Sequence, residues 1–239
     1  VATDPPARAP LGLAPAAQGG VYLADRRNGV VLLDRAGQVR GRWELLDLQA
    51  LAAGADGTAV AAAGEQLYRL RADHPPAPLG GLGTFRQVAA LAVEGSGKIW
   101  VLERRGERVG ALDPGASEVM PVWQAREAEL DALAWDGSRL VALDTKSRAV
   151  VTLEAGGATR PVVSGPLERS AGLAADLSGR VAVLDAKTDR VLVFGRDGRV
   201  QQTLAVRELG VERPAALTLG LDGVVQLLDA AAGNWVRLP

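Results

Sequence analysis

The chain has 239 residues, a formal net charge of −1 and no cysteine, and 48% of its residues are hydrophobic although only 4% are aromatic. The balanced charge argues against a dedicated nucleic-acid-binding protein, and the absence of cysteine excludes a disulfide framework and thiolate chemistry. No apolar run reaches the length of about 18 residues that a membrane span needs, so we expect none.

The first ten residues, VATDPPARAP, contain three prolines and differ from the rest of the chain. We expect residues 1–9 to form an extended linker, because proline cannot continue a strand ladder. Such a leader is typical of a mature exported protein, so we expect a bacterial protein that is periplasmic or associated with the outer membrane, with a lipid anchor upstream of residue 1. A cytosolic protein with a ragged end is the alternative.

A short apolar strand recurs along the chain at intervals of 38 to 44 residues, and it ends in an acid in all but one copy: VYLAD (Asp25), AVAAA (Ala63), IWVLE (Glu103), LVALD (Asp144), VAVLD (Asp185) and VQLLD (Asp229). About 12 residues before each of these positions stands a leucine among small residues: Leu13, Leu51, Leu91, Leu133, Leu173 and Leu217. A glycine-containing turn separates the leucine from the strand. Each unit therefore predicts strand A, a turn, strand B, a polar turn, strand C, a turn and strand D.

Six four-stranded units of about 40 residues predict an all-β, six-bladed β-propeller with antiparallel blades. We expect one domain over residues 10–239, with blades at about 10–45, 46–84, 85–125, 126–165, 166–207 and 208–239. The chain ends soon after the third strand of the sixth blade. We therefore expect Val1–Asp4 to supply the missing outer strand and to cover the exposed edge.

The units resemble NHL repeats, whose blades run from a glycine through a hydrophobic strand, an aspartate and a polar turn to an arginine and a second strand. The stretches that carry the resemblance are GKIWVLERRGERV from Gly97, GSRLVALDTKSRAV from Gly137 and GRVAVLDAKTDRV from Gly179. The second unit departs from the pattern at Ala63, and the sixth has Asn234-Trp235 where an arginine is expected. The resemblance implies a six-bladed propeller.

The acids that end the B strands have two interpretations. They form a functional ring of carboxylates, or each caps its own turn by accepting backbone N–H groups; we favour capping, because it explains the recurrence. The cations that follow these acids predict a basic arc on one face, which an anionic partner could bind: Arg26, Arg27, Arg104, Arg105, Lys146 and Lys187. The alternative is solvated turn charges paired with neighbouring acids.

Residues four before the strand-A leucines are expected to surround the mouth of the central channel: Asp47, Gln87, Glu129, Arg169 and Arg213. Glu127, Glu129 and Asp131 alternate, and together they are a weak candidate for a hard cation. Salt bridges to Arg169 and Arg213 would neutralise that cluster, so we expect no metal and no cofactor.

The tryptophans at the ends of two outer strands, Trp43 and Trp123, are expected to be exposed and to anchor an interface. His74 is the only histidine, and it lies in a proline-rich loop. No nucleophile elbow, zinc spacing or phosphate loop occurs, so the familiar catalytic sets are missing.

These features together predict a non-catalytic scaffold that binds another protein through the basic arc and the loops Pro75–Arg86 and Gln124–Asp131. The alternative is a metal-assisted propeller hydrolase or lyase that uses Asp47, Glu129 and Asp131 at the axis. RNA binding, as in some NHL proteins, is a third hypothesis, and the net charge argues against it.

Overall fold

A computed structural model of the chain describes residues 9–85, 87–103, 108–163 and 167–238. Over these residues the chain forms six antiparallel sheets in a ring, which confirms the all-β, six-bladed propeller. Two 3-10 turns, η1 (Ala17–Gly19) and η2 (Ala155–Gly157), complete the regular structure. No helix in this described part of the chain is long or apolar enough to cross a membrane.

The first three blades consist of β1 (Pro10–Pro15), β2 (Val21–Asp25), β3 (Gly29–Leu33) and β4 (Val39–Trp43); β5 (Leu48–Ala53), β6 (Ala59–Ala63), β7 (Gln66–Leu70) and β8 (Ala77–Leu79); and β9 (Val88–Val93), β10 (Ile99–Glu103), β11 (Arg108–Leu112) and β12 (Met120–Gln124). The last three consist of β13 (Leu130–Trp135), β14 (Leu140–Asp144), β15 (Ala149–Leu153) and β16 (Thr159–Pro161); β17 (Ser170–Ala175), β18 (Val181–Asp185), β19 (Arg190–Phe194) and β20 (Val200–Ala205); and β21 (Pro214–Leu219), β22 (Val225–Asp229) and β23 (Asn234–Arg237).

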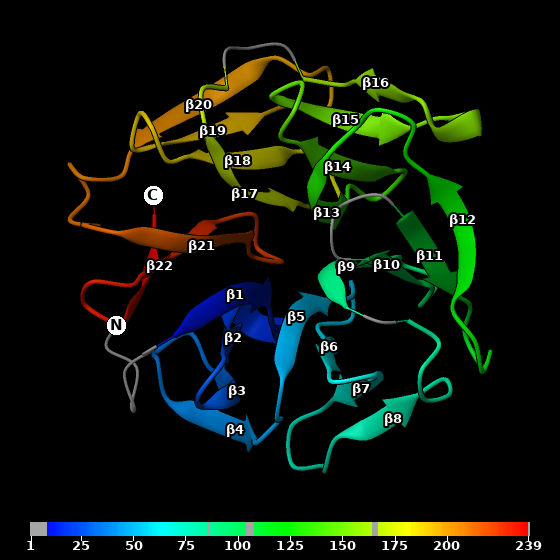
Figure 1. The fold of residues 1–239 in the computed structure, drawn as a ribbon. Coiled ribbons are helices and arrows are strands. Elements are labelled where there is room, and N and C mark those ends of the chain that lie inside the picture. The colour runs from blue at the N-terminus through cyan, green and yellow to red at the C-terminus, as the bar shows by residue number, and fades with distance from the viewer. Residues whose placement is uncertain (1–8, 86, 104–107, 164–166, 239) are drawn as a thin grey trace.

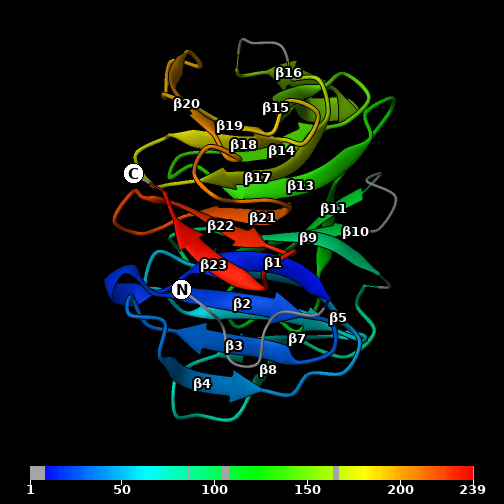
Figure 2. The same cartoon turned by 90° about the vertical axis from the view of Figure 1, so that its left-hand side faces the viewer.

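The A strands β1, β5, β9, β13, β17 and β21 surround the axis, and the D strands lie at the periphery (Figure 1). Each A strand packs against the A strands of both neighbours, and β21 packs against β1, so the ring is closed. Figure 2 shows the sixth blade next to the first. The sixth sheet has three strands among the described residues. The proposed closing strand Val1–Asp4 lies outside them.

The core consists of six apolar clusters, one at each interface between neighbouring blades. The strand-A leucines enter these interfaces, and small residues on either side of each leucine leave room for them. A Cβ atom added to Gly172 would lie 2.6 Å from Cδ2 of Leu217 in the next blade. The predicted frame of small residues around each leucine therefore follows from close packing between blades.

The expectation that Trp43 and Trp123 are exposed is wrong. The two rings are only 4% and 9% exposed and belong to the clusters between blades one and two and between blades three and four. The indole N–H of Trp43 donates to the carbonyl of His74, and that of Trp123 donates to the carbonyl of Glu154. In both cases a loop of the following blade covers the ring, so neither tryptophan offers a surface to a partner.

The strand-B aspartates Asp25, Asp144, Asp185 and Asp229 are buried and act as caps, as predicted. Each accepts the N–H of the residue two positions later, in its own B–C turn. Each also accepts an N–H from the segment that leads into strand A of the same blade. One carboxylate thus fixes both segments on the same face of the ring.

Burial disfavours the ionised form of Asp185 and Asp229, but the backbone N–H donors outweigh this effect and lower the pKa of both carboxyl groups. In the second blade Ala63 replaces the acid, and the N–H of Gly64 in the B–C turn donates to the carbonyl of Asp47 in the segment that leads into strand A. Gln49 forms a different link, from this turn to the next blade. The amide nitrogen of Gln49 donates to the carbonyl of Gly64, and its amide oxygen accepts the N–H of Val88 in the third blade.

Candidate active site at the axial basin

A cavity of about 700 Å³ opens at the end of the channel where the A strands begin. We call it the axial basin. Its walls are the first residues of the A strands of blades one to four and the segment 124–131. Leu48, Val88 and Leu130 give it an apolar part. Its size is within the range of about 300–1,000 Å³ that is typical of small-molecule sites.

A β-bulge at the start of every A strand determines which side chains reach this end of the channel. The pairing with strand B skips one residue in each blade: Leu11, Gln49, Ala89, Asp131, Ala171 and Ala215. A bulge leaves its extra residue unpaired and re-aims its side chain. The bulged residues of the first four blades line the axial basin, and Asp131 is the charged one among the six.

In the fourth blade, one buried carboxylate positions two further charged residues of the basin. The Oδ1 atom of Asp144 accepts the backbone N–H of Glu129 at 3.0 Å and that of Lys146 at 3.1 Å. The carbonyl of Glu129 also accepts the N–H of Thr145 at 2.9 Å. The backbones of an acid and a base on the wall of the cavity are therefore fixed by the same anchor.

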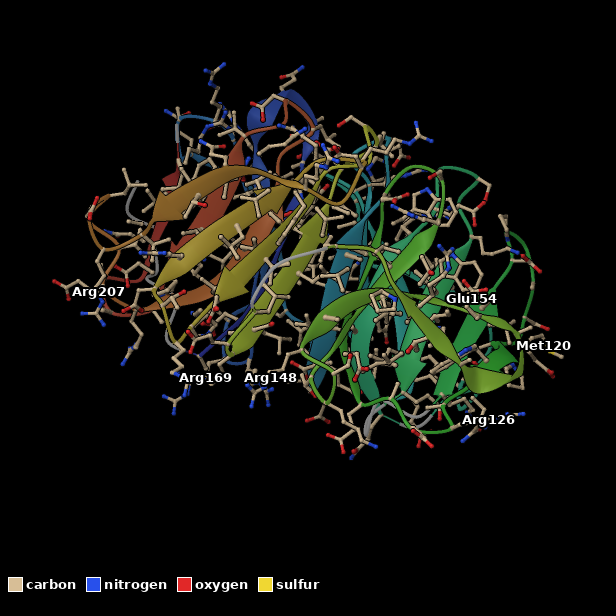
Figure 3. The ribbon with its side chains drawn as sticks, turned by 90° about the horizontal axis from the view of Figure 1, so that it is seen from above. Met120, Arg126, Arg148, Glu154, Arg169 and Arg207 are labelled. Carbon is tan, nitrogen blue, oxygen red and sulfur yellow. The ribbon has the colours of Figure 1, made fainter. Side chains whose placement is uncertain are left out.

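Six charged side chains line the axial basin, three of each sign: Arg26, Arg126, Lys146, Glu127, Glu129 and Asp131. None of them forms an ion pair with another residue in the described ranges, unlike Arg180 with Asp176 and Arg237 with Asp222 at the other end of the axis. Figure 3 shows Arg126, Arg148 and Arg169 along the same edge of the molecule, the face of the B–C turns. The basin can thus offer both acid–base groups and cations to a ligand.

Most of the residues predicted to surround the mouth of the channel do not line the axial basin. Of Asp47, Gln87, Glu129, Arg169 and Arg213, only Glu129 lines the axial basin. The guanidinium groups of Arg169 and Arg213 instead donate to carbonyls of their own B–C turns, at Ala186 and Ala230. The bulge contributes to the difference, because in blades one to four it brings the residue two positions before the strand-A leucine to the basin, and Glu129 is the one residue four positions before a strand-A leucine that also lines it.

The predicted basic arc is divided by the structure. Arg26 and Lys146 line the axial basin, whereas Arg27 is an exposed turn residue outside it and Lys187 pairs with Glu168. Arg104 and Arg105 lie outside the described residues.

The weak metal candidates Glu127, Glu129 and Asp131 all line the basin, but no group of three His, Cys, Asp or Glu side chains in the described part of the chain is placed to hold a metal ion. Asp47 is not in the basin, so the predicted set of Asp47, Glu129 and Asp131 does not assemble. His74 is exposed in its loop, where its Nδ1 lies 2.8 Å from the carbonyl oxygen of Ala72.

No protein-family model matches the chain, and no curated protein matches it. The NHL family is therefore not confirmed, although the six-bladed fold is. Solved structures share this fold at low identity. A gluconolactonase of Xanthomonas campestris is 18% identical, with a TM-score of 0.71 over 98% of this chain and 86% of its own. A streptogramin B lyase is 12% identical, with a TM-score of 0.61 over 93% and 91% of the two chains.

The hydrazine synthase of Kuenenia stuttgartiensis is 12% identical, with a TM-score of 0.66 over 100% of this chain and 97% of its own. These three neighbours are enzymes, and they contradict the prediction of a non-catalytic scaffold. That prediction took the lack of a familiar catalytic set as a sign of a non-catalytic role. Because proteins with this fold are named as enzymes, missing motifs do not show that a propeller is non-catalytic.

Proposed function

We propose that this chain is an enzyme that opens a small polar ester or lactone in the axial basin. The observation that carries the proposal is the anchoring of Glu129 and Lys146 by buried Asp144, with both residues lining one cavity and neither in an ion pair with a described residue. The gluconolactonase among the fold neighbours supports the choice of substrate class as an analogy of fold. We also propose that the blades are NHL-type repeats, on the sequence pattern described above.

The chemistry assigned to the basin is general acid–base catalysis. The Glu129 carboxylate takes a proton from water as the water oxygen adds to the carbonyl carbon of the substrate. The Lys146 ammonium stabilises the negative charge on the carbonyl oxygen. When the C–O bond of the ester breaks, the leaving oxygen recovers the proton from Glu129, which returns to its carboxylate form. Asp131 and Arg26 face the same cavity and orient the polar groups of the substrate.

The test is hydrolysis of a panel of five- and six-membered lactones, with acid release followed by a pH indicator. We expect turnover above the buffer rate, and we expect Lys146→Met to lower kcat/KM by a factor of about 10 to 100. A panel without turnover, or a Lys146→Met variant with the wild-type kcat/KM, would contradict the proposal.

Lys187→Met is the matched control. Lys187 occupies the equivalent turn of the fifth blade, and its N–H donates to Asp185 as that of Lys146 does to Asp144, but it lies outside the axial basin. This variant should retain the wild-type kcat/KM. Equal losses in the two variants would assign the effect to the surface charge of the face rather than to the basin.

A further inference from the structure

A second cavity, of about 450 Å³, lies at the other end of the propeller axis, where the A strands finish. We call it the leucine channel, because the six strand-A leucines line it: Leu13, Leu51, Leu91, Leu133, Leu173 and Leu217. Farther along the same strands its wall includes Ala53, Val93, Trp135, Ala175 and Leu219. Within the described part of the chain, no residue lines both this channel and the axial basin.

The rim of the leucine channel carries charges that are already neutralised. Arg180 pairs with Asp176 at 2.6 Å and also donates to the carbonyl of Gly223 at 2.9 Å, which links the fifth blade to the sixth. Asp222 pairs with Arg237 at 2.6 Å. An ionised ligand would therefore find no free counter-ion among these rim residues.

Exposed apolar side chains continue the channel wall out to the surface. Leu177 and Leu221, in the A–B turns of the fifth and sixth blades, are 53% and 41% exposed and line the mouth. Apolar side chains thus continue from the mouth to the ring of leucines, beside the polar groups of Ser178 and Thr218 and the paired charges of the rim. A cavity of about 150 Å³ lined by such side chains binds benzene, which has six carbon atoms, so the leucine channel, about three times as large, has room for at least a dozen.

From this lining, size and neutral rim, we propose that the leucine channel binds an uncharged aliphatic molecule with a chain of about ten carbons. The neutral rim excludes a fatty acid or an alkylammonium ion as the preferred ligand, because either would bring an unpaired charge to a site without a counter-ion. Each methylene group buried in the channel strengthens binding about three- to fourfold until the cavity is filled. The site is separate from the axial basin, so the proposal does not depend on the proposed catalytic activity.

The experiment is a fluorescence titration of the whole chain with 1-octanol and 1-decanol, below their solubility limits, and with decanoate and decylammonium. Trp135 lines the channel, so saturable binding should change the tryptophan emission, and Trp135→Phe should remove that change. We expect decanol to bind at least fivefold more tightly than octanol and at least tenfold more tightly than either ion. Absence of saturable decanol binding, or equal affinity for the ions, would overturn the proposal.

Filling the channel tests the location independently. Ala53→Leu and Ala175→Leu place extra carbon atoms in the channel from opposite blades, and each should weaken decanol binding at least tenfold. If one of the two variants fails to fold, the other still tests the location. Ala232→Leu, at an exposed turn on the other face, is the control and should bind decanol as the wild type does. Unchanged binding in a folded channel variant would overturn the proposal.

A second copy of the chain is the competing occupant of the exposed mouth. Light scattering coupled to gel filtration should show a monomer. If it shows a dimer, the double substitution Leu177→Ser and Leu221→Ser tests whether this mouth is the interface, and it should leave the dimer intact. A dimer that these two substitutions dissociate would overturn the assignment of this surface to a small molecule.

Discussion

The substitution Asp185→Ala removes the buried carboxylate that caps the fifth blade. It tests whether this carboxylate holds the B–C turn and the segment leading into strand A together, on the face where the axial basin opens. The carboxylate of Asp185 is 1% exposed. Its oxygens accept the N–H groups of Glu168 at 2.9 Å, Arg169 at 3.1 Å and Lys187 at 3.0 Å. The first two belong to the segment that leads into strand A, and the third belongs to the B–C turn.

The expected loss follows from these three bonds. A hydrogen bond to a charged group contributes about 1.5–3 kcal/mol, and removing the carboxylate also removes the cost of burying it. The donors lie in surface segments, where water can partly replace the lost acceptor. We therefore expect Asp185→Ala to lower the free energy of unfolding by about 3 kcal/mol near pH 7, and Asp185→Asn to lower it by less, because one oxygen acceptor remains.

The loss should depend on pH. Burial opposes ionisation of Asp185, but its backbone N–H donors dominate, so the pKa of the carboxyl group is lower in the folded than in the unfolded state. Its stabilising contribution is therefore complete above the unfolded-state pKa of about 3.9, and it disappears as the pH falls through the lower folded-state value. The difference in free energy of unfolding between wild type and Asp185→Ala should accordingly be smaller at about pH 3 than at pH 7.

Urea unfolding followed by circular dichroism measures both effects. Asp197→Ala is the control, because Asp197 lies in an exposed turn and accepts the N–H of Arg199 at 3.1 Å. It should cost about 0.5 kcal/mol or less. A loss below about 1 kcal/mol for Asp185→Ala, or a difference that stays constant between the two pH values, would refute the role assigned to the cap.

Two further changes test the contacts between turns and blades, again by urea unfolding. Gly29→Ala should cost about 3 kcal/mol or more, because Gly29 has a φ of 73° and an added Cβ would lie 2.1 Å from the carbonyl oxygen of Trp43. Gln49→Ala should cost about 2 kcal/mol, since it removes the 2.7 Å bonds to Gly64 and Val88 that join the second and third blades.

Each of these changes has a matched control on the surface. Gly95→Ala adds a Cβ with no heavy atom within 4 Å, and it should leave the free energy of unfolding almost unchanged. Gln38→Ala removes an exposed amide. A loss in either control as large as in its partner would show that the named contacts are not the cause.

The sequence predicted the architecture well because a blade repeats its chemistry. The leucine of strand A, the glycine turn and the acid that ends strand B recur because each blade has to fill the same interface and fix the same turn. Asp25, Asp144, Asp185 and Asp229 could be interpreted as caps for that reason. At the exception, Ala63, no carboxylate is present, and Gln49 instead links the turn to the third blade.

The positions of the site residues were harder to predict. Which side chains face the axis depends on the bulge at the start of each A strand, and a bulge is a property of strand pairing that leaves no period in the sequence. This is why Asp131 and Gln49 line the axial basin while Asp47 and Arg213 do not. The burial of Trp43 depends similarly on a loop of the following blade, which local patterning does not show.

The kcat/KM of Glu129→Gln relative to wild type, on the best lactone of the panel, is the most direct test of the axial basin as an active site. The variant keeps the backbone bonds of Glu129 to Asp144 and Thr145 and removes the base. We expect a loss of about 100-fold or more, with the wild-type free energy of unfolding retained. A ratio near one, in a folded variant of an active protein, would contradict the assignment of the basin as the site of catalysis.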